Sequence, residues 1–215
     1  MIERFTADDG RVDADAMRDA LTGTLSRRGL AALIARIAAS TRHGGEITLL
    51  MIDVDGLAAL DRLHGAGAGD QARMTIAHRL RLLVAPHDRV ARVAQDVFAC
   101  LLCHHAGAPV AIDTAREMIA AIAWPVDLAD TTVTLRGAAG IAAMPAGAPT
   151  SERLFAAARI AMEWAVARGH PGHCVYEPGL SVAGFPPATA TDHLWTHARP
   201  GGQTPEMLDR RAAGA

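Results

Sequence analysis

The chain has 215 residues, half of them apolar, with 21 basic and 23 acidic residues and a formal net charge of −2. This length is enough for one domain with a sizeable core, and the near-neutral charge argues against a general nucleic-acid binder. No apolar run is long enough for a transmembrane helix, so no membrane partner is expected. The N-terminus lacks the apolar core of a signal peptide and three cysteines make no disulfide framework, which favours a cytoplasmic protein.

Up to residue 55, the pattern predicts a polar lead, one helix and one strand. Residues 1–16 are polar and rich in aspartate. Ser26 is typical of a helix N-cap, and apolar residues follow it with helical spacing to about residue 40. Residues 47–55 form a nearly continuous apolar run that ends in two aspartates, as in a strand covered on both faces.

The middle of the chain predicts a helix followed by a hairpin. Residues 65–69 are rich in glycine, so we expect a loop there and a helix over 70–84. Two short strands, 89–93 and 97–103, then flank a turn at 94–96.

The last third of the chain continues the alternation of helices and extended segments. In order, we expect a helix over 110–122, extended segments over 131–135 and 138–143, a helix over 152–168 capped by Ser151, and a strand over 173–176. From residue 178 onward proline, glycine and threonine accumulate and apolar periodicity stops, so 178–215 is expected to be a disordered tail. The order predicts an α/β sandwich built on a mixed sheet.

Acidic residues gather at two predicted strand ends. Asp53 and Asp55 close one strand, and Asp96 lies at the tip of the later hairpin. Carboxylates with substrate phosphates are the usual ligands of Mg²⁺, and such metals support phosphoryl and nucleotidyl transfer. Acids at strand ends are also common as ordinary solvated residues, so the spacing alone leaves both interpretations open.

Four segments in order resemble the GGDEF, or diguanylate cyclase, domain. Residues 19–28 are similar to D-x-L-T-G-L-x-N-R, and 53–70 to D-x-D-x-F-K-x-x-N-D-x-x-G-H-x-x-G-D. Residues 88–98 resemble D-x-x-x-R-x-G-G-D-E-F, and 158–169 the closing A-D-x-A-M-Y-x-A-K-x-x-G-R helix. The resemblance implies a domain over 17–177 with a mixed central sheet flanked by helices, related to the nucleotidyl cyclase and palm architecture. It also implies a dimer that joins two GTP molecules into cyclic di-GMP with Mg²⁺ or Mn²⁺.

The resemblance assigns roles to four acids, of which three are retained from the family pattern. Asp53 and Asp96 match the family's metal-binding carboxylates. Asp70 matches an acid that binds guanine, and Asp61 stands where the family has a guanine-binding asparagine. An aspartate there still accepts hydrogen bonds from guanine but cannot donate one.

The signature itself departs from the family pattern, although its last residue, Phe98, is kept. Ala94 and Gln95 replace two glycines that let the backbone approach the nucleotide, and Val97 replaces an acid. Val166 stands where a lysine holds the GTP phosphates, as does Ala58, and the chain contains no lysine at all. A triphosphate site needs cations, so the remnant predicts a pseudo-enzyme with no confident catalytic residue and at most weak Mg²⁺ or Mn²⁺ binding.

The family's inhibitory motif, R-x-x-D, is also incomplete. Only Asp88 remains, because Ala85 occupies the arginine position. Arginine is the residue suited to bidentate phosphate and guanine recognition. The change argues against high-affinity cyclic di-GMP binding at this site.

Residues 100–104 match the C-x-x-C-H pattern of covalent haem attachment. On a strand, however, Cys100 and Cys103 would point to opposite faces, so we expect ordinary core cysteines in place of a haem or zinc site.

The sequence therefore favours a degenerate GGDEF signalling module without cyclase activity, which binds a partner protein and in which a nucleotide or metal site survives. A weak diguanylate cyclase, acting as a homodimer, and a GTP-binding regulator without turnover are the alternatives.

Overall fold

The computed structural model describes residues 16–40, 46–103, 107–145, 150–169 and 171–180. Its helices are α1 (Arg27–Ser40), α2 (Leu57–His64), α3 (Ala66–Leu83), α4 (Gly107–Ala123) and α5 (Ser151–Ala167). Its strands are β1 (Leu25–Ser26), β2 (Glu46–Asp55), β3 (Arg89–Arg92), β4 (Val97–Leu102), β5 (Val126–Asp127), β6 (Thr132–Val133), β7 (Arg136–Pro145) and β8 (Gly172–Val175).

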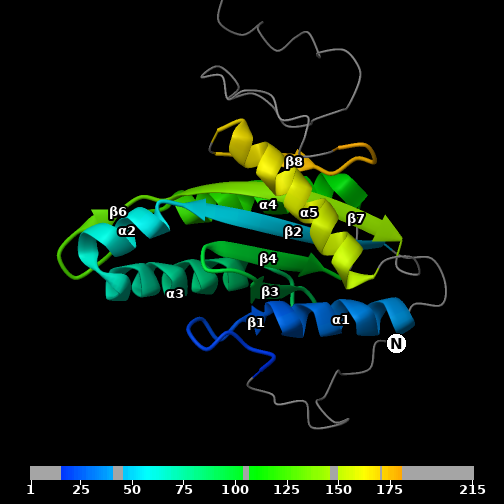
Figure 1. The fold of residues 1–215 in the computed structure, drawn as a ribbon, viewed down its shortest axis with the longest axis horizontal. Helices are drawn as coiled ribbons and strands as arrows, with labels where there is room; N and C mark the ends of the chain where they lie inside the picture. The colour runs from blue at the N-terminus through cyan, green and yellow to red at the C-terminus, as the bar shows by residue number, and fades with distance from the viewer. Residues whose placement is uncertain (1–15, 41–45, 104–106, 146–149, 170, 181–215) are drawn as a thin grey trace, which may run out of the picture.

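Six strands form a mixed central sheet in the order β1-β3-β4-β2-β7-β8. β2 lies inside the sheet and pairs antiparallel with β4 on one side and β7 on the other. The two outer pairs, β1 with β3 and β7 with β8, are parallel. The predicted α/β fold with a mixed sheet flanked by helices is confirmed (Figure 1).

Each face of the sheet is covered by its own helices. Leu50, Ile52 and Val54 of β2 pack in one buried cluster with residues of α3 and α4, while Leu49 and Met51 pack in another with residues of α1 and α5. Successive side chains of a strand point to opposite faces, so covering both faces requires an apolar residue at nearly every position. This explains the continuous apolar run of β2.

Three local predictions are wrong. Residues 66–69 belong to the first turns of α3 and not to a loop, and a separate helix, α2, lies directly before them. Gly56 (φ 105°) and Gly65 (φ 84°) make the two turns that bound α2, in a backbone region that favours glycine. At α5 the N-cap is Thr150, whose hydroxyl accepts the Arg153 N–H, while Ser151 is the first helical residue.

The described part of the chain extends past the predicted domain end. Leu180 is 6% exposed and packs with Cys174 and with Ala161 and Ala165 of α5. Leu180, which falls in the predicted tail, therefore packs with the domain, whereas Pro178 and Gly179 before it are exposed. The predicted polar lead, apart from residue 16, and the remaining tail, 181–215, lie outside the described residues.

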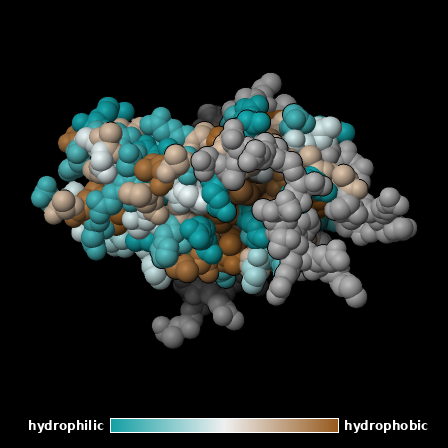
Figure 2. All heavy atoms as spheres, turned by 90° about the horizontal axis from the view of Figure 1, so that it is seen from below, coloured by the Kyte–Doolittle hydropathy of each residue, from teal (hydrophilic) through white to brown (hydrophobic). Residues whose placement is uncertain are grey.

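Figure 2 shows hydrophilic and hydrophobic residues side by side at the end where α2 and α3 lie. Leu63 of α2 and Leu82, near the C-terminal end of α3, are exposed large apolar residues. Within the described ranges, each helix is too short or too polar to cross a membrane.

Candidate functional site

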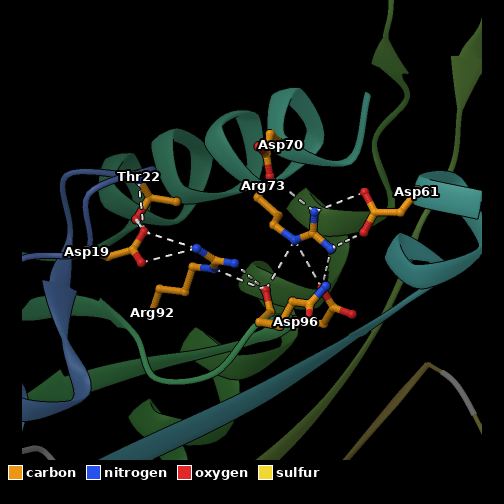
Figure 3. A network of polar contacts seen from close by, with 8 residues as sticks. Asp19, Thr22, Asp61, Asp70, Arg73, Arg92 and Asp96 are labelled. Atoms are coloured by element: carbon orange, nitrogen blue, oxygen red, sulfur yellow. Dashed lines mark hydrogen bonds and ion pairs between the residues drawn. The ribbon is translucent and has the colours of Figure 1, made fainter. Parts of the chain in front are cut away.

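Acidic side chains from three separate segments converge beside one end of the sheet. Asp61 comes from α2, Asp70 from α3, and Asp96 from the turn between β3 and β4. In Figure 3 all three surround the side chain of Arg73, which reaches down from α3. The structure thus brings together three of the four acids that the sequence singled out.

The guanidinium group of Arg73 is the centre of this cluster. Its Nη1 and Nη2 donate to the two carboxylate oxygens of Asp61, at 3.2 and 2.7 Å. Nε and Nη2 both donate to Asp96 Oδ1, at 3.1 and 2.7 Å, and Nη1 lies 3.4 Å from Asp70 Oδ1. Nε also donates to the backbone carbonyl of Gln95. A buried arginine thus has an acceptor for each of its three nitrogens.

Burial and charge are distributed unevenly in the cluster. The Arg73 side chain is 2% exposed, whereas those of Asp61, Asp96 and Asp70 are 21%, 25% and 47% exposed. Hydrogen bonds from Arg73 lower the pKa of Asp61 against the opposing effect of burial. Hydrogen bonds to Asp61 in turn raise the pKa of Arg73, so the group stays ionised. Three carboxylates and one guanidinium leave a net negative site that faces solvent.

Gly69 makes the contact between α2 and α3 close enough for this geometry. A Cβ atom at this position would lie 1.8 Å from Asp61 Oδ1 and 2.7 Å from Arg73 Nη1. The carboxylate of Asp61 therefore occupies the space that any other residue at 69 would fill. Glycine inside a helix normally lowers helix stability, and here it admits the ion pair.

A second arginine fixes the turn that carries Asp96. Arg92 Nε and Nη2 donate to the same Gln95 carbonyl, at 3.0 and 2.9 Å, and its Nη1 pairs with Asp19 at 3.1 Å. Burial tends to raise the pKa of Asp19, but hydrogen bonds from Thr22 and the Arg92 charge outweigh it, and the pKa is lowered. The segment 19–22, the turn and α3 thus form one polar network (Figure 3).

The predicted metal pair is only partly assembled. Asp53 is half-buried at the end of β2, opposite Val97 of β4, and the next residue, Val54, donates its N–H to the Asp96 carbonyl. The Asp96 carboxylate, however, is engaged by Arg73. Among the described residues, no group of three or more potential ligands is placed to hold a metal ion. In this arrangement a divalent cation would compete with Arg73 for the Asp96 carboxylate, and the assignment of Asp53 and Asp96 as metal ligands stays a prediction.

The remaining signature residues have structural surroundings. Ala94 and Gln95 are exposed, Val97 is half-buried against the α1–α5 side of the core, and Phe98 is fully buried on the other side. The alternation is that of a strand emerging from a turn.

Asp88, Cys100 in β4 and Cys103 directly after β4 have structural roles. Asp88 accepts the backbone N–H of Cys103 at 2.9 Å, so the inhibitory-motif remnant ties the chain before β3 to the end of β4. Cys100 and Cys103 pack on opposite faces of the sheet, as predicted, and burial raises the pKa of both thiols, that of Cys103 to about 11.

The sequence interpretation missed Arg73, although a signal was present. The buried face of α3 carries Gly69, Ala72, Ile76, Ala77 and Leu80 at helical spacing, and Arg73 lies on that same face. An arginine on an apolar stripe needs acceptors for its hydrogen bonds. Two of the acids that supply them, Asp61 and Asp96, were predicted to bind a guanine base and a metal ion.

A separate hollow lies between α1 and α5. It is lined by Arg27, Phe155 and Arg159 among others and contains none of the predicted site residues.

Comparison with known proteins places these observations in a family. Residues 16–171 match the family described as "Diguanylate cyclase, GGDEF domain". The diguanylate cyclase TpbB of Pseudomonas aeruginosa is 32% identical over 149 residues, which cover 68% of this chain and 34% of TpbB. The chain spans between a fifth and a third of the length of its first curated relatives.

Solved structures agree with the family match. The isolated GGDEF domain of TpbB superposes with a TM-score of 0.69 at 30% identity and covers 74% of this chain and 94% of that domain. The diguanylate cyclase SiaD, also from Pseudomonas aeruginosa and solved with its activator SiaC, has a TM-score of 0.66 at 23% identity, covering 72% of this chain and 60% of SiaD. At that identity the likeness to SiaD concerns the fold.

Proposed function

Because the chain belongs to the GGDEF diguanylate cyclase family, we propose that it is a degenerate member of it, a signalling module in a cyclic di-GMP pathway without cyclase turnover. It acts in the cytoplasm through a partner protein, and its acidic pocket retains at most weak affinity for a nucleotide or divalent cation. A complex of this kind has a precedent in the same fold, since SiaD is solved with a protein activator.

One observation carries the proposal: the acidic pocket is filled by a side chain of the domain itself. Arg73 pairs with Asp96 at the position of a metal-binding acid, and with Asp61 and Asp70 at positions of guanine-binding residues. A guanine base that pairs with both oxygens of Asp61 must displace this guanidinium, and a divalent cation must compete with it for Asp96. Val97 and Val166 stand at positions where the family has charged residues, and neither valine supplies a charge that could attract a metal ion or a nucleotide.

The phosphate site lacks the positive charges that efficient turnover needs. Loss of one positioned donor for a developing charge costs about 3 kcal/mol, or a hundredfold in rate. In this chain the lysine positions of the phosphate site carry Ala58 and Val166. Each of the two 3′–5′ phosphodiesters of cyclic di-GMP forms as a 3′-hydroxyl attacks the α-phosphate of a GTP and pyrophosphate leaves. Because these cations are missing from the phosphate site, we expect almost no product.

The test is a direct assay of the full chain. Purified protein is incubated with GTP and either Mg²⁺ or Mn²⁺, and the products are separated by chromatography, with an active family member as the positive control. We expect no cyclic di-GMP above the level of a protein-free blank. Turnover comparable to that of the control enzyme would refute the proposal.

A weak cyclase is the second candidate, because the family acids Asp53, Asp70 and Asp96 are present. Asp70 and Asp96, together with Asp61, also face solvent in part. In that case slow formation of cyclic di-GMP would depend on Asp96 and on protein concentration, since two domains must meet as a homodimer. Loss of the product in Asp96→Asn would identify this activity as the chain's own.

A further inference from the structure

The donor pattern of Arg73 resembles that of a guanine base. The Watson–Crick edge of guanine presents a ring N–H and an amino N–H on one side, and these bind a carboxylate through two parallel hydrogen bonds. Arg73 presents Nη1 and Nη2 to the two oxygens of Asp61 in the same paired manner, at 3.2 and 2.7 Å. Guanine contains a guanidine fragment, so the likeness concerns the same chemical group.

We propose that Arg73 is a built-in occupant of a guanine pocket: it takes the hydrogen bonds that a guanine base would make with Asp61 and Asp70, and it neutralises Asp96. This inference rests on the proposed function, because it takes the pocket of the family and asks what fills it in this chain. It makes the absence of turnover a consequence of self-occupation as well as of missing phosphate ligands.

The construction of the pocket distinguishes this arrangement from an ordinary surface ion pair. The Arg73 side chain is 2% exposed and has acceptors from α2, α3 and the β3–β4 turn. Gly69 leaves room for the Asp61 carboxylate directly against the backbone of α3. Truncation of Arg73 therefore opens a space that is bounded by the carboxylates of Asp61, Asp70 and Asp96.

Self-occupation lowers affinity by competition. A ligand binds only the fraction of molecules in which Arg73 has left the pocket, and its apparent dissociation constant rises by the inverse of that fraction. Truncation of Arg73 removes the competitor and leaves three carboxylates without their counter-ion. The truncated protein should therefore bind small molecules that carry a guanidine fragment.

The experiment compares Arg73→Ala with the wild type and with Arg81→Ala, a matched change at an exposed arginine on the same helix. Each protein is melted alone and with about 10 mM methylguanidinium, GMP or AMP, and binding is measured by calorimetry. We expect Arg73→Ala to melt several degrees below the wild type. Methylguanidinium and GMP, but not AMP, should then raise its Tm by about 3 °C or more.

The wild type and Arg81→Ala should show no rise with methylguanidinium or GMP. No rise in Arg73→Ala, an equal rise in all three proteins, or an equal response to GMP and AMP would each overturn the proposal. If Arg73→Ala does not fold, Arg73→Met preserves much of the buried stem and is tested for GMP binding in the same way. No selective binding by that variant would likewise overturn it.

These outcomes are independent of the cyclase assay. If the wild type makes no cyclic di-GMP and Arg73→Ala binds neither methylguanidinium nor GMP, the proposed function is supported and the role of Arg73 as a guanine mimic is refuted. A wild type that makes cyclic di-GMP removes the proposed function, while the binding data for Arg73→Ala still decide the role of Arg73.

Discussion

At the scale of single residues, a charged side chain on the buried face of α3 persists because every nitrogen of it has an acceptor. An ionised group taken out of water costs several kcal/mol unless it is paired and hydrogen-bonded. Arg73 meets this condition through Asp61, Asp96 and the Gln95 carbonyl. The carboxylates keep one side in water, which reduces their own desolvation. The cluster is therefore sensitive to the exact room available to Asp61, and Gly69 sets that room.

Gly69→Ala should detach Asp61 from Arg73, because the new methyl group would lie 1.8 Å from Asp61 Oδ1. The side chain can swing away, so the cost is the broken ion pair, about 1–3 kcal/mol, against a gain of up to about 1 kcal/mol in helix propensity. We expect a net loss of about 1 kcal/mol in the free energy of unfolding, measured by urea denaturation. Gly67→Ala is the matched control, since a Cβ there meets nothing within 4 Å.

A double-mutant cycle separates the Asp61 contact from the helix. In an Asp61→Ala background the contact with Asp61 Oδ1 is gone, and the remaining close contact, 2.7 Å to Arg73 Nη1, is with the end of a flexible side chain. Gly69→Ala should therefore cost much less there than in the wild type, and approach the effect of Gly67→Ala. Equal effects of Gly69→Ala in the wild type and in the Asp61→Ala background would show that Asp61 does not carry the cost.

At the scale of secondary-structure elements, carboxylates act as connectors. Asp61 joins α2 to α3 through Arg73, and Asp19 joins the segment before β1 to β3 through Arg92. The Gln95 carbonyl accepts from both arginines, so the β3–β4 turn is held from two sides. The positions of α2, of the turn and of the N-terminal segment therefore depend on the ionised state of these two acids.

This dependence predicts the response to acid. Both acids have a folded-state pKa below the ordinary value of 3.8. A lowered pKa contributes stability that is fully present above the unfolded value and is lost as the pH falls through the folded value. The free energy of unfolding, measured with urea, should therefore fall as the pH drops below about 4.

Asp19→Asn and Asp61→Asn should each be less stable than the wild type near neutral pH and should lose less stability on acidification. Asp130→Asn, at an exposed site outside the network, serves as the control and should keep the full acid response. A parallel acid response in all four proteins would show that Asp19 and Asp61 do not carry it.

How far the sequence predicts these elements depends on the range of the interactions. The apolar run of β2, the hairpin at 94–96 and the N-cap at Ser26 follow from local pattern, and Ser26 Oγ does accept the Gly29 N–H. The split between α2 and α3 was missed because glycines at 65, 67 and 69 are typical of a loop, whereas Gly67 and Gly69 lie in α3 and Gly69 packs directly on Asp61. The role of Arg73 could not be inferred locally, since its acceptors come from elements up to 23 residues away.

At the scale of the whole molecule, the sheet separates two packing layers and leaves the polar network beside one end of it. α1 and α5 cover one face and α3 and α4 the other, so the core is closed on both sides (Figure 1). The last described element, β8, pairs parallel with β7, and the chain then packs Leu180 against α5. We therefore expect the folded unit to extend to Leu180, three residues beyond the family-like segment predicted from the sequence.

This boundary can be tested by truncation. A chain that ends at Leu180 should melt within about 1 °C of the full chain, because residues 181–215 are rich in proline, glycine and threonine and lack periodic apolar residues. A chain that ends at Tyr176 loses Leu180, which is 6% exposed, and should melt lower.

Leu180→Ala in the full chain should reproduce that loss of stability, about 2 kcal/mol in the free energy of unfolding or 4–8 °C in Tm. Leu82→Ala, at a side chain that is 72% exposed, is the matched control and should leave the Tm unchanged. A chain ending at Leu180 that melts many degrees below the full chain would instead mean that apolar residues further on, such as Leu194 and Trp195, stabilise the domain.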